Sequence, residues 1–177
     1  MNRMFLFASV LLLSACSPAT TEAEFQPVAT VRDLMAYIVD PAADVVWESV
    51  STRITIEGVE EQAPRTDEEW ANVRRHALQM VEATNLLLMP RPIAKPGETA
   101  APDQTVELGP EEIQKLVDAD RATFNDLALG LHKAAMVALD ATNRKDAQAL
   151  FDSGEGIQIA CEGCHMKYWY PNDVRPQ

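Results

Sequence analysis

Two cysteines and a histidine near the end of the chain are the residues best suited to chemistry. They lie in the stretch "IACEGCHMKYWYP", where Cys161 and Cys164 are three residues apart and His165 follows directly. A close pair of thiols can form a disulfide, contribute to a zinc site, or attach haem covalently through the pattern C-x-x-C-H. The chain has only three cysteines and three histidines in all, so few further ligands are available.

The context of the motif favours haem over the two other uses. A redox-active C-x-x-C usually opens a helix after a strand, whereas these cysteines lie near the end of an expected helix. Zinc commonly takes its four ligands from two spaced pairs, and the chain has no second cysteine pair. Residues three and four apart share one face of a helix, so Cys161, Cys164 and His165 can address one flat ligand. The motif therefore predicts one covalent haem c, with two thioether bonds from the cysteines and His165 on the iron.

The start of the chain predicts export and lipidation. Arg3 precedes an apolar run over residues 4–13, which is too short to span a bilayer and suits a signal peptide. The run ends in "LSAC", which resembles the bacterial lipobox, so we expect residues 1–15 to be removed and Cys16 to carry lipid. An ordinary secretory signal with an incidental cysteine is the alternative. Ser17 resembles the residue after the cysteine in lipoproteins sent to the outer membrane. Export also agrees with the haem prediction, because haem c is attached outside the cytoplasm.

The size and net charge of the chain indicate the number of domains and the kind of partner to expect. Loss of Arg3 with the signal peptide takes the formal net charge from −12 to −13. Such acidity argues against nucleic acid as a partner, since its phosphates need a basic patch, and it favours basic partners. About 160 mature residues suit one domain with a real core. The expected organisation is a signal peptide at 1–15, a lipidated tether at 16–27, one domain at 28–171 and a tail at 172–177.

Four segments repeat apolar residues every three to four positions, which predicts helices. The first is interrupted by Pro41, where either the helix kinks or Asp40 caps a second helix. Thr66 and Glu69 have the spacing of a capping box at the start of the second. A loop with some extended character is expected between these two. The four helices are predicted at residues 31–50, 66–88, 110–138 and 145–169.

The last predicted helix carries the haem motif. Its apolar face is expected to include Leu150, Phe151, Ile157 and the two cysteines. Gly154 and Gly156 allow either close approach of a neighbour or a break in this helix. Four amphipathic helices in a chain of this length predict an all-α fold, an antiparallel four-helix bundle in which the C-terminal helix holds the haem.

A C-terminal C-x-x-C-H on the last helix of such a bundle resembles the cytochrome c′ superfamily, and its lipoprotein or low-spin branches most closely. The resemblance covers residues 28–170, although its specific motif is confined to 161–168. Family members commonly carry an aromatic residue three positions after the histidine and a basic residue one further on. Tyr168 matches the aromatic, whereas Trp169 stands in the basic position. This departure concerns the proximal side of the haem, and Lys167 points elsewhere on the helix.

The resemblance implies that the distal haem residue comes from the first helix. Met35 lies in the matching region and is expected either to bind the iron, to line the distal pocket without binding, or to pack in the core. Leu34 is the alternative if the register shifts by one residue. His76 and His132 are expected to be surface or hydrogen-bonded histidines rather than iron ligands.

These expectations favour a function in electron transfer. The leading hypothesis is a monohaem c-type cytochrome, a one-electron carrier and not an enzyme, anchored by lipid at the periplasmic face of a membrane. Alternatives are a protein that binds nitric oxide or carbon monoxide at an open sixth position, and a structural subunit of a larger redox complex. The expected partners are redox proteins of basic charge, and the resemblance also admits a homodimer. Apart from the haem iron bound by His165 and Met35, no metal is expected.

Overall fold

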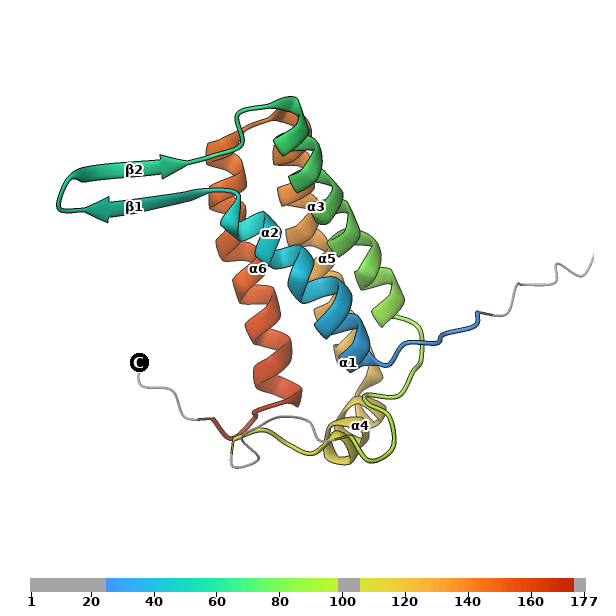
Figure 1. Ribbon diagram of the computed structural model, residues 1–177. Coiled ribbons are helices and arrows are strands. Elements are labelled where there is room, and N and C mark those ends of the chain that lie inside the picture. Colours follow the sequence, from blue (N-terminus) through green and yellow to red (C-terminus); the bar gives the residue numbers. More distant parts are fainter. Residues whose placement is uncertain (1–24, 99–105, 174–177) are drawn as a thin grey trace, which may run out of the picture.

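A computed structural model describes residues 25–98 and 106–173 of the chain (Figure 1). Within these ranges the chain is helical apart from one β-hairpin and the connecting loops, which confirms the all-α prediction and adds the hairpin. No helix in the described ranges combines the length and apolarity that a membrane crossing requires. In chain order the elements are α1 (Val31–Leu34), η1 (Met35–Val39), α2 (Asp40–Glu48), β1 (Ser51–Thr55), β2 (Gly58–Gln62), α3 (Asp67–Leu87), α4 (Pro110–Ala119), α5 (Arg121–Arg144) and α6 (Ala147–Tyr168).

The first three helical elements run on from one another without a break. The expected cap by Asp40 at Pro41 is wrong, because the residues before Pro41 form one turn of π-helix, η1, from which α2 continues. The Asp40 N–H donates to the carbonyl of Met35, five residues back, and the Asp40 side chain makes no capping bond. Proline lacks an N–H and its ring crowds the preceding turn of an α-helix, so the wider π-turn accommodates it. Met35 is therefore the first residue of an unusual turn.

The segment after α2 forms a hairpin that stands away from the helices (Figure 1). Its two strands pair antiparallel, with Ile54 opposite Val59. Gly58 has a φ of 138°, a conformation that favours glycine, and closes the tight turn. Ile54, Ile56 and Val59 are all exposed, so the hairpin adds little to the core. The expectation of a loop with extended character is thus refined to two short strands.

The long helices after the hairpin begin with defined caps. Thr66 and Glu69 form the predicted capping box at the start of α3. The third predicted helix was wrong as a single element, because it breaks at Asp120 into α4 and α5. Asp120 has φ −141° and ψ 58°, and its carboxylate accepts a hydrogen bond from the Thr123 N–H at 3.2 Å. Asp120 is thus an N-cap inside a segment whose apolar spacing is otherwise continuous.

The last helix, α6, agrees with its predicted bounds to within two residues at each end. It continues through both of its central glycines, so the predicted alternative of a helix break is wrong. A Cβ at Gly154 would lie 3.2 Å from Cδ1 of Trp47, whereas Gly156 has ordinary space around it. Phe151 is 48% exposed, contrary to expectation, since its neighbour Leu150 takes the buried face. Gly154 therefore allows α2 to approach α6 closely.

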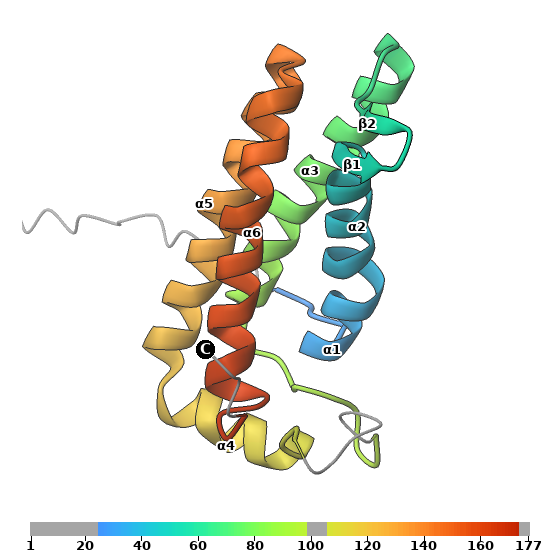
Figure 2. The ribbon, with the colours of Figure 1, turned by 90° about the vertical axis from the view of Figure 1, so that its left-hand side faces the viewer.

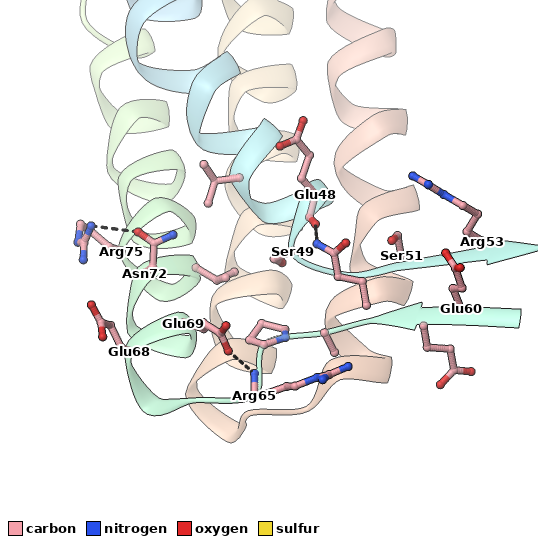
Figure 3. Close-up of a pocket in the computed structure, with 16 residues that line it drawn as sticks. Glu48, Ser49, Ser51, Arg53, Glu60, Arg65, Glu68, Glu69, Asn72 and Arg75 are labelled. Carbon is pink, nitrogen blue, oxygen red and sulfur yellow. Dashed lines mark hydrogen bonds between the residues drawn. The ribbon is translucent and has the colours of Figure 1, made fainter.

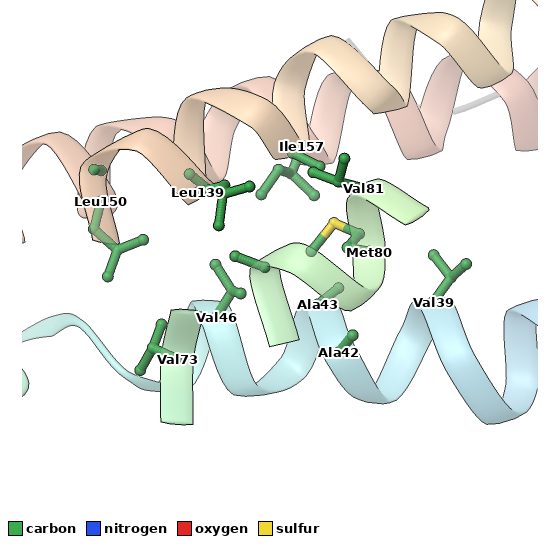
Figure 4. Close-up of a cluster of buried hydrophobic side chains, with 14 of the residues drawn as sticks. Val39, Ala42, Ala43, Val46, Val73, Met80, Val81, Leu139, Leu150 and Ile157 are labelled. Atoms are coloured by element: carbon green, nitrogen blue, oxygen red, sulfur yellow. The ribbon is translucent and has the colours of Figure 1, made fainter. Parts of the chain in front are cut away.

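The helices surround two clusters of buried apolar side chains. Helices α3 and α6 each pack against both α2 and α5, and Figure 2 shows α4 lying across the end remote from the hairpin. The first core cluster is drawn in Figure 4, and its labelled members are Val39, Ala42, Ala43, Val46, Val73, Met80, Val81, Leu139, Leu150 and Ile157. The second core cluster, nearer α4, consists of Val31, Leu34, Leu87, Ile93, Ile113, Val117, Phe124, Ala128 and Tyr168.

Candidate haem-attachment site

The three motif residues lie near the C-terminal end of α6. Cys161, Cys164 and His165 are all half-buried, and both cysteines are free thiols. Cys161 packs against the first core cluster and Cys164 against the second. The motif therefore lies where the two clusters adjoin, and contacts with both clusters hold this part of α6 in place.

The surroundings of the two thiols keep them protonated. Burial, with a smaller contribution from the negative charges of Asp40 and Glu162, raises the pKa of Cys161 to about 11. Burial, and secondly the proximity of Cys161, raises the pKa of Cys164 to about 12. Disulfide exchange and zinc binding use the thiolate, and catalytic cysteines have a lowered pKa. The environment is thus opposite to that of a redox-active C-x-x-C pair.

The imidazole of His165 is suited to bind a metal. Burial lowers its pKa, and this effect outweighs the opposing charges of Glu162, Asp40 and Glu107. A neutral imidazole keeps a free lone pair, which is the form that binds a transition metal. His165 can therefore act as an iron ligand at neutral pH.

Met35 shares a cavity with His165. The cavity has a volume of about 220 Å³ and lies between η1, the start of α4 and the end of α6. Leu34 is buried in the second core cluster and does not line it, so of the two predicted distal residues only Met35 lines this cavity together with His165. The full lining consists of Arg32, Met35, Ile93, Ala94, Glu107, Pro110, Ile113, His165, Trp169 and Tyr170.

The residues after α6 close over His165. The ring centroids of Trp169 and His165 are 5.7 Å apart, and those of Tyr170 and His165 are 6.0 Å apart. The Leu108 N–H donates to the carbonyl of Trp169 at 2.8 Å, which fixes this turn against the loop before α4. Trp169 thus packs on the imidazole at the position where the family has a basic residue.

Lys167 does not replace that basic residue. Its Nζ lies 3.3 Å from a carboxylate oxygen of Asp120 and 5.6 Å from the ring centroid of Tyr168. Tyr168 itself is buried, packs edge-on against Phe124, and donates its hydroxyl to the carbonyl of Asp120 at 3.2 Å. Lys167 and Tyr168 therefore join the end of α6 to the start of α5.

The donor set fits a covalently attached haem, but the cavity as it stands is small. Two thiols and an imidazole lie together on one helix, and Met35, which has a thioether, lines the same cavity as the imidazole. Sites for ligands of drug size usually measure roughly 300–1,000 Å³, so a cavity of about 220 Å³ must open to admit a macrocycle.

The other candidate residues are used elsewhere. His132 shares a hydrogen bond of 2.8 Å with the Thr84 hydroxyl, and His76 one of 2.9 Å with the Asn72 carbonyl, as expected for hydrogen-bonded histidines. The described residues contain no cluster of three or more histidine, cysteine or acidic side chains that could hold a metal ion. Cys16 and the predicted signal peptide lie outside the described residues, as does most of the predicted tail.

A larger hollow lies at the other end of the molecule. It measures about 1100 Å³, is lined mainly by polar side chains, and lies between the hairpin and the start of α3 (Figure 3). Its labelled residues include Arg53, Glu60 and Arg65, and none of the haem-motif residues lines it. Size alone therefore does not indicate the chemical site in this molecule.

Several residues of the candidate site were not predicted from the sequence. Ile93 and Ala94 come from the loop after α3, and Glu107 and Pro110 from the loop and first turn before α4. Loop residues carry no periodic pattern, so only the chain path brings them to the motif.

No family model, curated protein sequence or solved structure matches the chain. The resemblance to the cytochrome c′ superfamily therefore stays a prediction that depends on the motif and the helices.

Proposed function

We propose that this protein is a monohaem c-type cytochrome that carries single electrons, with its long helices arranged as an antiparallel four-helix bundle. The observation that supports it best is that Cys161, Cys164 and His165 share the half-buried end of α6 while Met35 lines the cavity beside His165. Two free thiols and a neutral imidazole are the groups that covalent haem attachment uses. The motif and the expected export of the chain agree with this function independently.

Each of these residues has a distinct role in the proposed site. Cys161 and Cys164 would hold the haem by thioether bonds, and His165 would bind the iron through its neutral imidazole. Met35, which lines the same cavity as His165, would supply a thioether sulfur as the second iron ligand. A bound haem supplies a one-electron couple between Fe(III) and Fe(II), and axial ligation and burial set its potential. Trp169 and Tyr170 shield the imidazole from water and thereby limit reorganisation around it.

The proposed location follows from the N-terminus. Lipid on Cys16 would hold the protein at the periplasmic face of a bacterial membrane, with the outer membrane favoured by Ser17. The net negative charge suits basic redox partners, which it attracts most strongly at low ionic strength. A Cys16→Ser change should release the protein from the membrane fraction and leave its haem spectrum unchanged.

The visible spectrum of the purified protein tests the proposal. We expect a low-spin reduced spectrum that carbon monoxide does not alter, and haem that stays on the polypeptide after denaturation. The double variant Cys161→Ser/Cys164→Ser should lose the covalent haem, whereas Cys16→Ser should keep it. A reduced spectrum that changes with carbon monoxide would favour the gas-binding alternative, and absence of covalent haem from the wild-type protein would refute the whole proposal.

A further inference from the structure

Two arginines meet at the C-terminal end of α3, away from the haem motif. Arg91 and Arg121 both line an open pocket of about 500 Å³. Its remaining walls are formed by Pro90 and Pro92, which stiffen the loop, and by Gln114 and Asp118 of α4. Because none of these residues lines the cavity beside His165, the pocket is separate from the candidate haem site.

Each arginine is held in place by backbone carbonyl groups. Arg121 donates from Nη2 to the carbonyls of Leu87 and Leu88, at 3.0 and 3.1 Å. Arg91 donates from Nε to the carbonyl of Met89 at 3.3 Å and from Nη1 to that of Ala29 at 3.1 Å. The carbonyls at the end of a helix lack partners within the helix, so Arg121 caps α3, while Arg91 ties the loop after α3 to the segment before α1.

The hydrogen bonds to carbonyl groups do not neutralise the positive charges of Arg91 and Arg121. Arg91 is only 8% exposed, and in the described part of the chain no carboxylate forms an ion pair with Arg91 or Arg121. Arginine is almost never buried without an ionic partner. Asp118 also lines the pocket, but its carboxylate accepts a hydrogen bond from Gln114 at 2.9 Å. Burial, and secondly the charge of Arg121, lower the pKa of Arg91, as expected for neighbouring cations.

We propose that Arg91 and Arg121 bind a phosphate group, either as the free ion or as the headgroup of an anionic phospholipid. The Nη2 group of Arg91 and the Nε and Nη1 groups of Arg121 make no hydrogen bond to any described residue, so they remain to donate to such a ligand. A guanidinium fork matches the geometry of phosphate oxygens and binds them in pairs. A bound phosphate would also supply the missing negative charge.

The position of the pocket suggests the second source. Arg91 contacts the carbonyl of Ala29, two residues after the end of the tether expected at residues 16–27. If Cys16 carries lipid, the pocket lies at the protein end of a short tether, within reach of headgroups. The arginine contacts do not depend on the haem, so the phosphate site and the proposed electron-transfer function can fail separately.

Thermal unfolding of the full-length holoprotein in a non-ionic detergent tests the site for the free ion. Inorganic phosphate, titrated against chloride at constant ionic strength, should raise the unfolding temperature saturably. In Arg91→Gln/Arg121→Gln the apparent Kd should rise at least about tenfold, since each lost charge-assisted bond costs about that factor. Glutamine can still donate to the carbonyls and preserve the caps. The control Arg74→Gln/Arg75→Gln removes the same charge from the exposed face of α3 and should respond as the wild type does.

Lipid nanodiscs distinguish the two sources. The same protein in discs of phosphatidylglycerol should unfold at a higher temperature than in discs of phosphatidylcholine, and the Arg91→Gln/Arg121→Gln variant should lose that difference. A response to phosphate alone assigns the free ion, and a response to the discs alone assigns the headgroup. No response in either arm, or an undiminished response in the double variant, overturns the proposal. If the double variant does not fold, Arg121→Gln alone replaces it, because Arg121 is the less buried of the pair.

Discussion

Met35 is the single residue on which the chemistry of the proposed iron site most depends. It is half-buried, lines the cavity beside His165, and contacts both core clusters. We predict that Met35→Ala converts low-spin iron to high-spin iron and lets carbon monoxide bind, because the sixth ligand is lost. Visible spectra of the oxidised, reduced and carbon monoxide-treated variant measure this change.

Met35→Leu is the matched control for packing. Leucine keeps an apolar side chain of similar volume but has no sulfur, and such exchanges usually cost less than about 1.5 kcal/mol of stability. If Met35 binds iron, Met35→Leu should be high-spin like the alanine variant while unfolding near the wild-type temperature. Low-spin spectra in both variants would remove Met35 as a ligand and leave it a packing residue.

At the residue scale, the sequence predicted those site residues that are close together along the chain. Cys161, Cys164 and His165 are placed together by helix periodicity, which the sequence displays directly. Choosing Met35 over Leu34 required the structure, since the two differ by one residue in register. Ile93 and Glu107 were not predictable, because loops bring them to the cavity from distant parts of the chain.

At the scale of elements, the approach of α2 to α6 depends on a glycine. A Cβ on Gly154 would lie 3.2 and 3.3 Å from two atoms of the Trp47 indole, which is tighter than an ordinary contact. We predict that Gly154→Ala destabilises the protein by about 1–2 kcal/mol, because overpacking outweighs the gain in helix propensity. Urea unfolding of the holoprotein measures the difference.

Gly156→Ala is the control in the same helix. Its Cβ would meet the Cβ of Ala134 at 3.9 Å, an ordinary contact. Alanine should therefore stabilise α6 here by about 0.5–1 kcal/mol through helix propensity alone. Equal effects at both positions would show that Trp47 moves aside without cost.

The capping box of α3 makes part of the stability depend on pH. Glu69 accepts hydrogen bonds from the Arg65 and Thr66 N–H groups at 2.6 and 2.9 Å, and these bonds lower its pKa from the ordinary 4.5. A carboxyl whose pKa is lowered by folding contributes stability above its unfolded pKa, and loses it as the pH falls through the folded value. We predict that Glu69→Gln is less stable than wild type at pH 7, and that the gap closes by pH 3.

Glu68→Gln is the comparison for that experiment. It removes a charge from the same first turn but is not part of the capping box. The free energies of unfolding of Glu69→Gln and Glu68→Gln should therefore differ at pH 7 and agree at pH 3. A gap between Glu69→Gln and wild type that stays constant with pH would contradict the assignment.

Features of the elements that depend on neighbouring residues were predictable from the sequence, and those that depend on distant contacts were not. The Thr66–Glu69 box has a fixed spacing and was predicted correctly, since it depends on four neighbouring residues. The break at Asp120 was missed because the apolar spacing continues across it, and a buried contact of Tyr168 with its carbonyl helps to fix the turn. The π-turn at Met35 follows from Pro41, but the sequence offers a kink or a cap equally well.

At the scale of the whole molecule, the haem motif joins two cores of unequal size. The first core cluster spans α2, α3, α5 and α6, whereas the second gathers residues from α1, the end of α3 and the loop after it, α4, the first turns of α5 and the end of α6. Cys161 contacts the first cluster and Cys164 the second, while Met35 contacts both. A covalent haem at this point would therefore link the smaller cluster to the larger one.

Hydrogen exchange of a variant without haem tests this link. In Cys161→Ser/Cys164→Ser, amides of α1 and of the last turns of α6 should exchange at least about tenfold faster, because the second cluster loses the covalent one of its connections to the first. Amides of α3 and of the Ala135–Ala141 part of α5 should keep their protection, since the first cluster is intact without haem. Cys16→Ser, which removes a cysteine but leaves the haem, should exchange as the wild type does. A uniform increase in exchange rate across all helices would mean that the haem stabilises one undivided core. Unchanged exchange rates would mean that the site does not stabilise the fold.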